Sequence, residues 1–116
     1  MKLNDKSATI MEFRKEIETF VIERKWKEYH NPKDLAIAIN VESAELLENF
    51  LFLKEKLINE SKIEDIKQEI ADVFIYLMSM VNAMNLDLTE IFYQKMEKNR
   101  KKYPVDEFHD GNYNKK

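Results

Sequence analysis

The chain has 116 residues, of which 44% are hydrophobic and 35% are charged, and its formal net charge is −3. This composition is typical of one soluble helical domain with a real core, and the mild acidity disfavours a nucleic-acid partner. Because the sequence contains no cysteine, disulfides, thiolate metal sites and thiol catalysis are excluded. One glycine and two prolines leave little material for sheet turns, so we predict an all-α fold.

The sequence predicts neither export nor a membrane partner. Residues 1–5 carry no apolar core of the kind that a signal peptide needs, so we expect a cytoplasmic protein. The most apolar run, from Val73 to Met84, is shorter than the roughly 20 residues that span a bilayer, and Ser79 and Asn82 interrupt it. We therefore predict a core helix at this run.

Two capping signals predict the first pair of helices. Thr9 followed by Glu12 has the form of a capping box, and the helix that it opens should extend to about Glu28. Asn31 before Pro32 is typical of an N-cap followed by proline at the first helical position, and this helix should extend to about residue 56. The first helix has an ordinary amphipathic stripe, made of Ile10, Phe13, Ile17, Phe20 and Val21.

Two further signals predict a second pair of helices. Ser61 with Glu64 repeats the capping box and opens a third helix, which should end near Asn85 in a left-handed cap. Asp87 opens a fourth helix in the same way. This helix should stop before Pro104, because the residue before a proline avoids helical geometry.

The four helices are expected to form one domain over residues 1–104. The second and third helices are apolar nearly all round, which is typical of the centre of a bundle or of an oligomer interface. We therefore predict a four-helix bundle that is completed by oligomerisation. The polar residues 105–116 should form a loose or partner-dependent tail.

Two acidic pairs, Glu42-x-x-Glu45 and Glu69-x-x-Asp72, lie within these two apolar helices. Residues three apart on a helix share a face, so each pair could direct two carboxylates to one point. Ionised carboxylates are almost never buried unless they are paired or bind a metal. Four of them together predict a site for Mg²⁺, with Mn²⁺ as a substitute, and hence phosphate chemistry.

Helical spacing places both pairs on faces that turn toward the core or its edge. On the second helix this face should contain Leu35, Ala38, Ile39, Glu42, Glu45, Leu46 and Asn49. On the third helix one stripe should contain Ile66, Glu69, Ile70, Val73, Tyr76 and Leu77, with Asp72 beside it.

Two other interpretations of the acids were considered. A di-iron carboxylate bundle needs Glu-x-x-His motifs, but neither His30 nor His109 has a glutamate three residues before it. A helical interaction module, whose acids form salt bridges and whose apolar helices only dimerise, stays open from the residues alone.

Five blocks of sequence resemble, in their order, the MazG-like all-α nucleoside triphosphate pyrophosphohydrolase superfamily, and most closely its dCTP pyrophosphatase-like branch. The resemblance covers about residues 10–104. The blocks are Glu23-Arg24-Lys25-Trp26, Tyr29-His30-x-Pro32, residues 41–46 around the first acidic pair, residues 69–77 around the second, and residues 95–104.

This resemblance implies an enzyme that needs Mg²⁺ and cleaves between the α and β phosphates of a nucleoside triphosphate. The implied substrate is a deoxynucleoside triphosphate like dCTP, and the implied role is to clear the nucleotide pool. The implied metal ligands and catalytic residues are Glu42, Glu45, Glu69 and Asp72, with Glu45 the candidate general base. The implied substrate-binding residues are Trp26, Lys27, Glu28, Tyr29, His30, Phe52, Tyr76, Lys95 and Asn99. The resemblance also implies a homodimer or homotetramer, with sites near subunit contacts.

The chain departs from the family pattern at four positions. Val41 and Ala44 stand where the family often has glycine beside the first acids. Phe52 and Ile17 stand where the dCTP-preferring members have a pocket tryptophan and a histidine. The preferred base and sugar therefore stay open, and dUTP, a damaged nucleotide and phosphoribosyl-ATP are alternative substrates.

Overall fold

The computed structural model describes residues 3–53, 58–111 and 113 of the chain, and all regular structure within them is helical. This confirms the predicted all-α fold. The elements are α1 (Ile10–Glu23), η1 (Lys27–Tyr29), α2 (Pro32–Glu48), η2 (Glu60–Lys62), α3 (Ile63–Ala83), α4 (Leu88–Lys102) and α5 (Val105–Phe108), where η marks a 3-10 helix.

The contacts within the chain separate two compact units. The first unit, Met1–Leu86, contains α1, α2 and α3, and the second, Asp87–Lys116, contains α4 and α5. The expected single domain over residues 1–104 stays a prediction. No described helix combines the length and the hydropathy that a membrane span would need.

The first helix ends earlier than predicted, at Glu23 rather than near Glu28, because the chain forms a Schellman motif. Trp26 N–H donates to the Val21 carbonyl at 3.0 Å, while Lys25 lies in the left-handed region with φ of 56°. A lysine in this conformation costs roughly 1–2 kcal/mol relative to right-handed geometry. The sequence pattern therefore gave no signal for this stop.

The predicted end of α2 and the predicted start of α3 were also wrong. Helix α2 ends at Glu48 instead of near residue 56, and residues 54–57 lie outside the described part of the chain. Ser61 does not cap α3; instead, the Asn59 side chain accepts hydrogen bonds from the Ser61 backbone N–H at 3.1 Å and from its hydroxyl at 2.8 Å. These bonds open the short helix η2, and α3 begins after it.

Most of the remaining signals at helix ends are confirmed. The box at Asp87 forms in part: the Asp87 side chain accepts from the Glu90 N–H at 2.9 Å, while the Glu90 side chain accepts from Gln94. Thr9 and Glu12 form the capping box, and the Asn31 side chain accepts from the Asp34 N–H at 2.9 Å. Asn85 is left-handed with φ of 51°. In the second unit, α4 ends at Lys102, as the following proline requires.

The C-terminal tail was expected to be loose, but part of it is helical. Residues Val105–Phe108 form α5, and the rings of Tyr103 and Phe108 pack edge to face with their centroids 5.3 Å apart.

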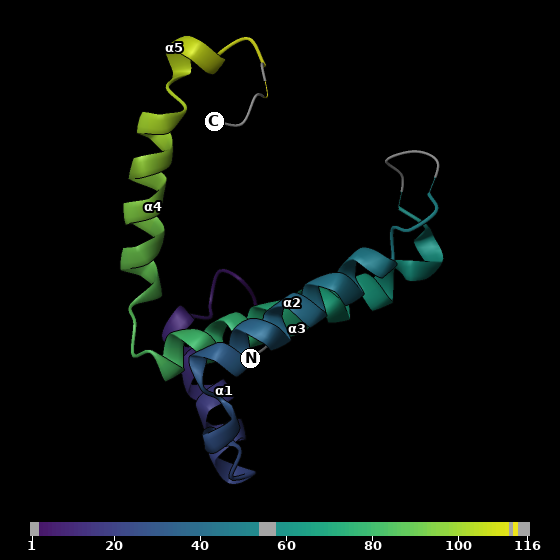
Figure 1. The fold of residues 1–116 in the computed structure, drawn as a ribbon, viewed down its shortest axis with the longest axis vertical. Helices are drawn as coiled ribbons and strands as arrows, with labels where there is room; N and C mark the ends of the chain where they lie inside the picture. Colours follow the sequence, from purple (N-terminus) through teal and green to yellow (C-terminus); the bar gives the residue numbers. More distant parts are fainter. Residues whose placement is uncertain (1–2, 54–57, 112, 114–116) are drawn as a thin grey trace. The chain divides into compact units, whose positions relative to one another are not determined.

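In the first unit, α2 and α3 lie side by side and antiparallel, and α1 packs against α3 (Figure 1). Phe13 and Phe74 meet edge to face at 5.5 Å between centroids. Arg14 Nε donates to Asn82 Oδ1 at 2.8 Å, and Asn82 Nδ2 donates back to the Arg14 carbonyl at 3.1 Å. These contacts join α1 to α3.

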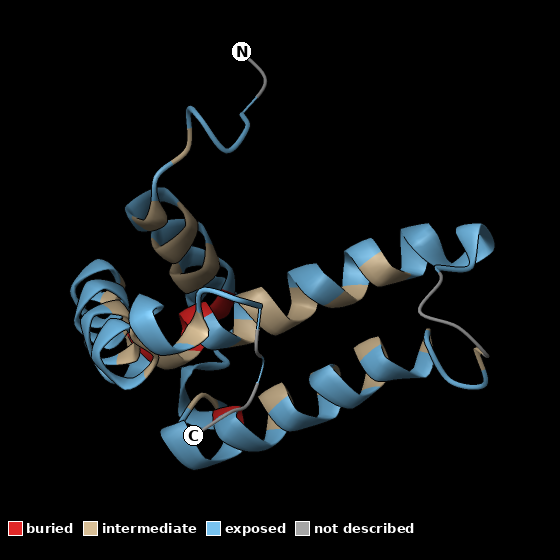
Figure 2. Cartoon of the chain, turned by 90° about the horizontal axis from the view of Figure 1, so that it is seen from above, coloured by how far each residue is buried: buried red, intermediate tan, exposed pale blue. Residues whose placement is uncertain are grey.

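The core of this unit is small. Figure 2 shows few buried residues, coloured red, against a mostly exposed ribbon. The buried apolar residues are Val21, Leu35, Met78 and Val81.

The inward face predicted for α2 is confirmed, since each of its seven residues is buried or half-buried. The stripe predicted for α3 was wrong at two positions, because Ile70 and Leu77 are 54% and 43% exposed. Apolar side chains on α2, among them Ile37 and Val41, are exposed as well.

Candidate functional site

Three carboxylates from two helices converge between α2 and α3. One oxygen each of Glu42, Glu69 and Asp72 lies within 4.8 Å of the others, and all three side chains are half-buried. They meet because α2 and α3 run antiparallel, so that the middle of one helix faces the middle of the other. Glu45, one turn after Glu42, is also half-buried, and its carboxyl interacts electrostatically with those of Glu42 and Glu69.

This crowding changes the acidity of the cluster. Burial, followed by hydrogen bonding with Glu45 and the charges of Glu45, Asp72 and Glu69, raises the pKa of Glu42 to about 7. Burial first, and then the charges of Glu45 and Asp72, also raise the pKa of Glu69. Without a cation, Glu42 is therefore about half protonated near pH 7.

The donor set suits a hard divalent cation. Oε2 of Glu42 and Oε2 of Glu69 are buried and have no hydrogen-bond partner among the described residues. The ion pairs found in the described part of the chain all use other acids, namely Glu18, Glu23, Glu64 and Glu97. Buried carboxylate oxygens without donors or cationic partners are the ligands that Mg²⁺ and Mn²⁺ prefer. A purely salt-bridged role for these acids is thereby disfavoured.

Two hollows open one turn from the acids. The first, which we call the α2-side hollow, has about 280 Å³ and is bordered by Ala38, one turn before Glu42, and by Tyr76, one turn after Asp72. Its other walls include Trp26, Tyr29, His30 and Asp34. The second, the α1-side hollow, has about 240 Å³ and lies between α1 and α3. Its walls include Ile17, Phe20, Ile75 and Ser79.

Three aromatic residues, Trp26, His30 and Tyr76, belong to both hollows. The rings of His30 and Tyr76 lie 6.5 Å apart between centroids, with 33° between their planes. Trp26 meets Phe20 edge to face at 5.8 Å. The Schellman motif after α1 is what turns Trp26 and the following segment toward α3.

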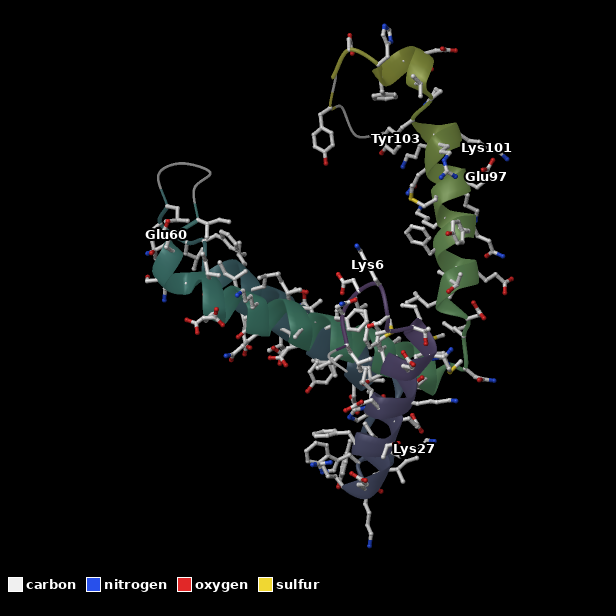
Figure 3. The ribbon with its side chains drawn as sticks, turned by 180° about the vertical axis from the view of Figure 1, so that it is seen from behind. Lys6, Lys27, Glu60, Glu97, Lys101 and Tyr103 are labelled. Carbon is white, nitrogen blue, oxygen red and sulfur yellow. The ribbon has the colours of Figure 1, made fainter. Side chains whose placement is uncertain are left out.

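The structure brings only some of the predicted substrate-binding residues to this place. Trp26, Tyr29, His30 and Tyr76 line the hollows. Lys27, labelled beside α1 in Figure 3, instead pairs with Glu18 at 2.6 Å.

The other predicted residues lie elsewhere. Glu28 is exposed on η1 and lines neither hollow. Phe52 follows the end of α2, and it is 98% exposed with φ of 65°. Lys95 and Asn99 lie on α4 in the second unit, so their roles stay predictions.

Two residues of the site had no assigned role in the sequence. Asp34 lies in the first turn of α2, where its backbone N–H donates to the Asn31 cap, and it borders the α2-side hollow. Ser79 was noted only as an interruption of an apolar run, yet it is buried and lines the α1-side hollow. A serine within an otherwise apolar helix was the available signal.

This chain is therefore an all-α protein with a candidate metal centre. The centre consists of carboxylates from two antiparallel helices, and it lies beside an aromatic hollow. The MazG-like family model matches residues 37–115, which is more than half of the chain. The chain belongs to the MazG-like family, as the five sequence blocks had predicted.

Relatives with curated names were also found. The chain is 29% identical to dCTP pyrophosphatase 1 of Rattus norvegicus and of Homo sapiens over 102 residues, which is 84% of this chain. It spans about 60% of the length of these relatives. The crystal structure of a pyrophosphatase from Archaeoglobus fulgidus DSM 4304 is similar, with 34% identity and a TM-score of 0.74 over 89% of this chain and 99% of the other.

Proposed function

We propose that this protein is a Mg²⁺-dependent nucleoside triphosphate pyrophosphohydrolase, which releases a nucleoside monophosphate and pyrophosphate. The observation that carries the proposal is the convergence of Glu42, Glu69 and Asp72 within 4.8 Å, one turn from an aromatic hollow. The names of the relatives, dCTP pyrophosphatase 1 and pyrophosphatase, support the same reaction class.

The metal would be held by Glu42, Glu69 and Asp72, and the orphaned oxygens of Glu42 and Glu69 fit a hard cation. When bound, Mg²⁺ neutralises the negative charge that develops on the phosphate oxygens. Glu45 lies beside this set and interacts with Glu42, so it is the proposed acceptor of a proton.

The reaction needs water, a base and a positioned triphosphate. Water attacks the α-phosphorus, Glu45 takes the proton of that water, and the bond between the α-phosphorus and the bridging oxygen breaks to release pyrophosphate. Trp26 and Tyr76 would hold the nucleoside against the hollow, and such stacking is worth about 1–3 kcal/mol per base. Lys95 and Asn99 are the proposed contacts of the leaving phosphates.

We further propose that the active form is a homodimer or homotetramer. The exposed apolar residues Ile37, Val41, Ile70 and Leu77 on α2 and α3 support this assembly. Phe52 lines neither hollow of its own chain. In such an assembly, Phe52 would instead contact the substrate that is bound to a second copy.

Replacing Asp72 with asparagine tests the proposal. Pyrophosphate release from a panel of nucleoside triphosphates should fall at least about 100-fold, since even residues that only support a metal ligand cost about 10–100-fold. The matched control is Asp65→Asn, an exposed acid on the same helix, which should leave turnover unchanged. Equal loss in both variants, or turnover by Asp72→Asn at the wild-type rate, would contradict the proposal.

A further inference from the structure

Ser79 is a buried polar side chain with no partner. The residue is 4% exposed, and its hydroxyl oxygen is buried and makes no hydrogen bond to any described residue. A serine within a helix often donates to the carbonyl four residues earlier, but no such bond forms here. A buried hydroxyl without a partner destabilises a fold relative to alanine. This position is therefore costly for stability alone.

Ser79 is one of the residues that line the α1-side hollow. Around it, Ile17, Val21 and Ile75 offer no side-chain hydrogen-bonding group, and Trp26 and Tyr76 supply aromatic surface. Glu16 also borders the hollow, but its side chain is exposed, which places it at the mouth. His30 is shared with the α2-side hollow.

A much smaller hollow also borders Ser79. It has about 20 Å³ and is lined partly by Glu18, Lys27 and His30. This volume has room for about one water molecule. A water held there would give the serine a structural role, which makes a clear alternative to a role in binding.

We infer that the hydroxyl of Ser79 reads the edge of the nucleobase, when the base enters the α1-side hollow against Trp26, His30 and Tyr76. This inference rests on the proposed function, because it takes the base of a nucleoside triphosphate as the occupant. A flat heterocycle matches the aromatic surfaces, and its polar edge would meet the one orphaned hydroxyl among the apolar walls.

The chemistry of a hydroxyl sets the specificity. A serine hydroxyl can donate one hydrogen bond and also accept, so it pairs with an amino group or with a carbonyl. Cytosine carries an amino group where uracil carries a carbonyl, and a hydroxyl that contacts this position accepts both bases alike. A site that discriminated strongly between an amino group and a carbonyl would need a group that can only donate or only accept a hydrogen bond.

The test uses Trp26, the only tryptophan in the chain, as a fluorescent reporter beside the hollow. Wild type is titrated, with Mg²⁺ present, with the nonhydrolysable α,β-methylene analogues of dCTP and dUTP and with inorganic tripolyphosphate. The same titrations are made with Ser79→Ala and with Ser61→Ala, the control at an exposed serine. Glu16→Gln is titrated as well, to test whether the carboxyl at the mouth of the hollow binds the base instead of Ser79.

Wild type should bind the two analogues with dissociation constants within about threefold of each other. Ser79→Ala should weaken both by about three- to tenfold, the cost of one hydrogen bond, and leave tripolyphosphate unchanged. Because this variant removes an orphaned hydroxyl, its melting temperature should stay the same or rise. Ser61→Ala should change no dissociation constant.

Several results would overturn the inference: unchanged analogue binding in Ser79→Ala, equal weakening of tripolyphosphate, or loss of binding in Glu16→Gln alone. The first of these is also the outcome if the hydroxyl serves only an internal water. Binding of the analogues, together with no pyrophosphate release from dCTP or dUTP themselves, would refute the proposed function and leave the base-reading role standing. Wild type that binds no analogue would refute both.

Discussion

Metal binding by the acidic cluster should depend steeply on pH. Without a cation, burial and the neighbouring carboxyls raise the pKa of Glu42 from its ordinary value of 4.5 to about 7. A divalent cation binds the ionised form, so each ion must displace the proton that Glu42 holds. Apparent affinity should therefore fall as the pH drops below 7.

The size of the effect follows from this pKa. If one proton is displaced, the apparent affinity is divided by one plus ten raised to the difference between pKa and pH. It should then fall about tenfold from pH 8 to pH 6, and about 90-fold from pH 8 to pH 5. The pKa of Glu69 is raised as well, so these figures are lower bounds.

Isothermal titration calorimetry with Mg²⁺ or Mn²⁺ measures both quantities. At pH 6, titrations in buffers of different ionisation enthalpy should report the release of about one proton per ion. Glu42→Gln should bind more weakly at pH 8 and show a flatter dependence on pH. An affinity that is the same within twofold at pH 6 and pH 8, with no proton released, would refute the reasoning.

The same pKa sets the sign of a stability effect. Since the pKa is higher in the folded chain, the folded state holds more protons than the unfolded state between about pH 4.5 and 7. The contribution of Glu42 to stability is thus complete below pH 4.5 and is lost as the pH rises through 7. Thermal unfolding should show added Mg²⁺ stabilising the protein more at pH 8 than at pH 5.

Three further predictions concern the fold and the assembly. Lys25→Gly should raise the free energy of unfolding by about 1 kcal/mol, since glycine tolerates the positive φ. Lys15→Gly within α1 should lower it by about as much. Thermal denaturation that shows the same sign for both variants would refute this prediction. Asn82→Ala should lower the free energy of unfolding in urea by about 1–3 kcal/mol, because it leaves the half-buried Arg14 groups unpaired. Asn40→Ala, at an exposed residue, should lower it by less than about 0.5 kcal/mol. A loss that small in Asn82→Ala would contradict the prediction. Light scattering should report a dimer or tetramer that Ile70→Glu weakens but Gln68→Glu, at an exposed polar residue beside it, does not; a monomeric wild type would remove the assembly.

The sequence by itself determined the features that depend on local chemistry and on helical period. Asn31, Asp87 and Asn85 act at helix ends as their side chains and backbone preferences predict. The spacing of 3.6 residues per turn identified the inward face of α2, and with it the position of Glu42. These predictions hold because each concerns groups within one or two turns of the same helix.

Tertiary structure decided what depends on contacts between distant parts of the chain. The early stop of α1 requires a left-handed Lys25, whose local cost must be offset by packing beyond the helix. Whether Ile70 is covered depends on how many neighbours α3 has, which no spacing reveals. The burial of Ser79 beside the α1-side hollow likewise emerges only from the packing of α1 on α3, because burial of a hydroxyl is a property of its surroundings and not of the residue.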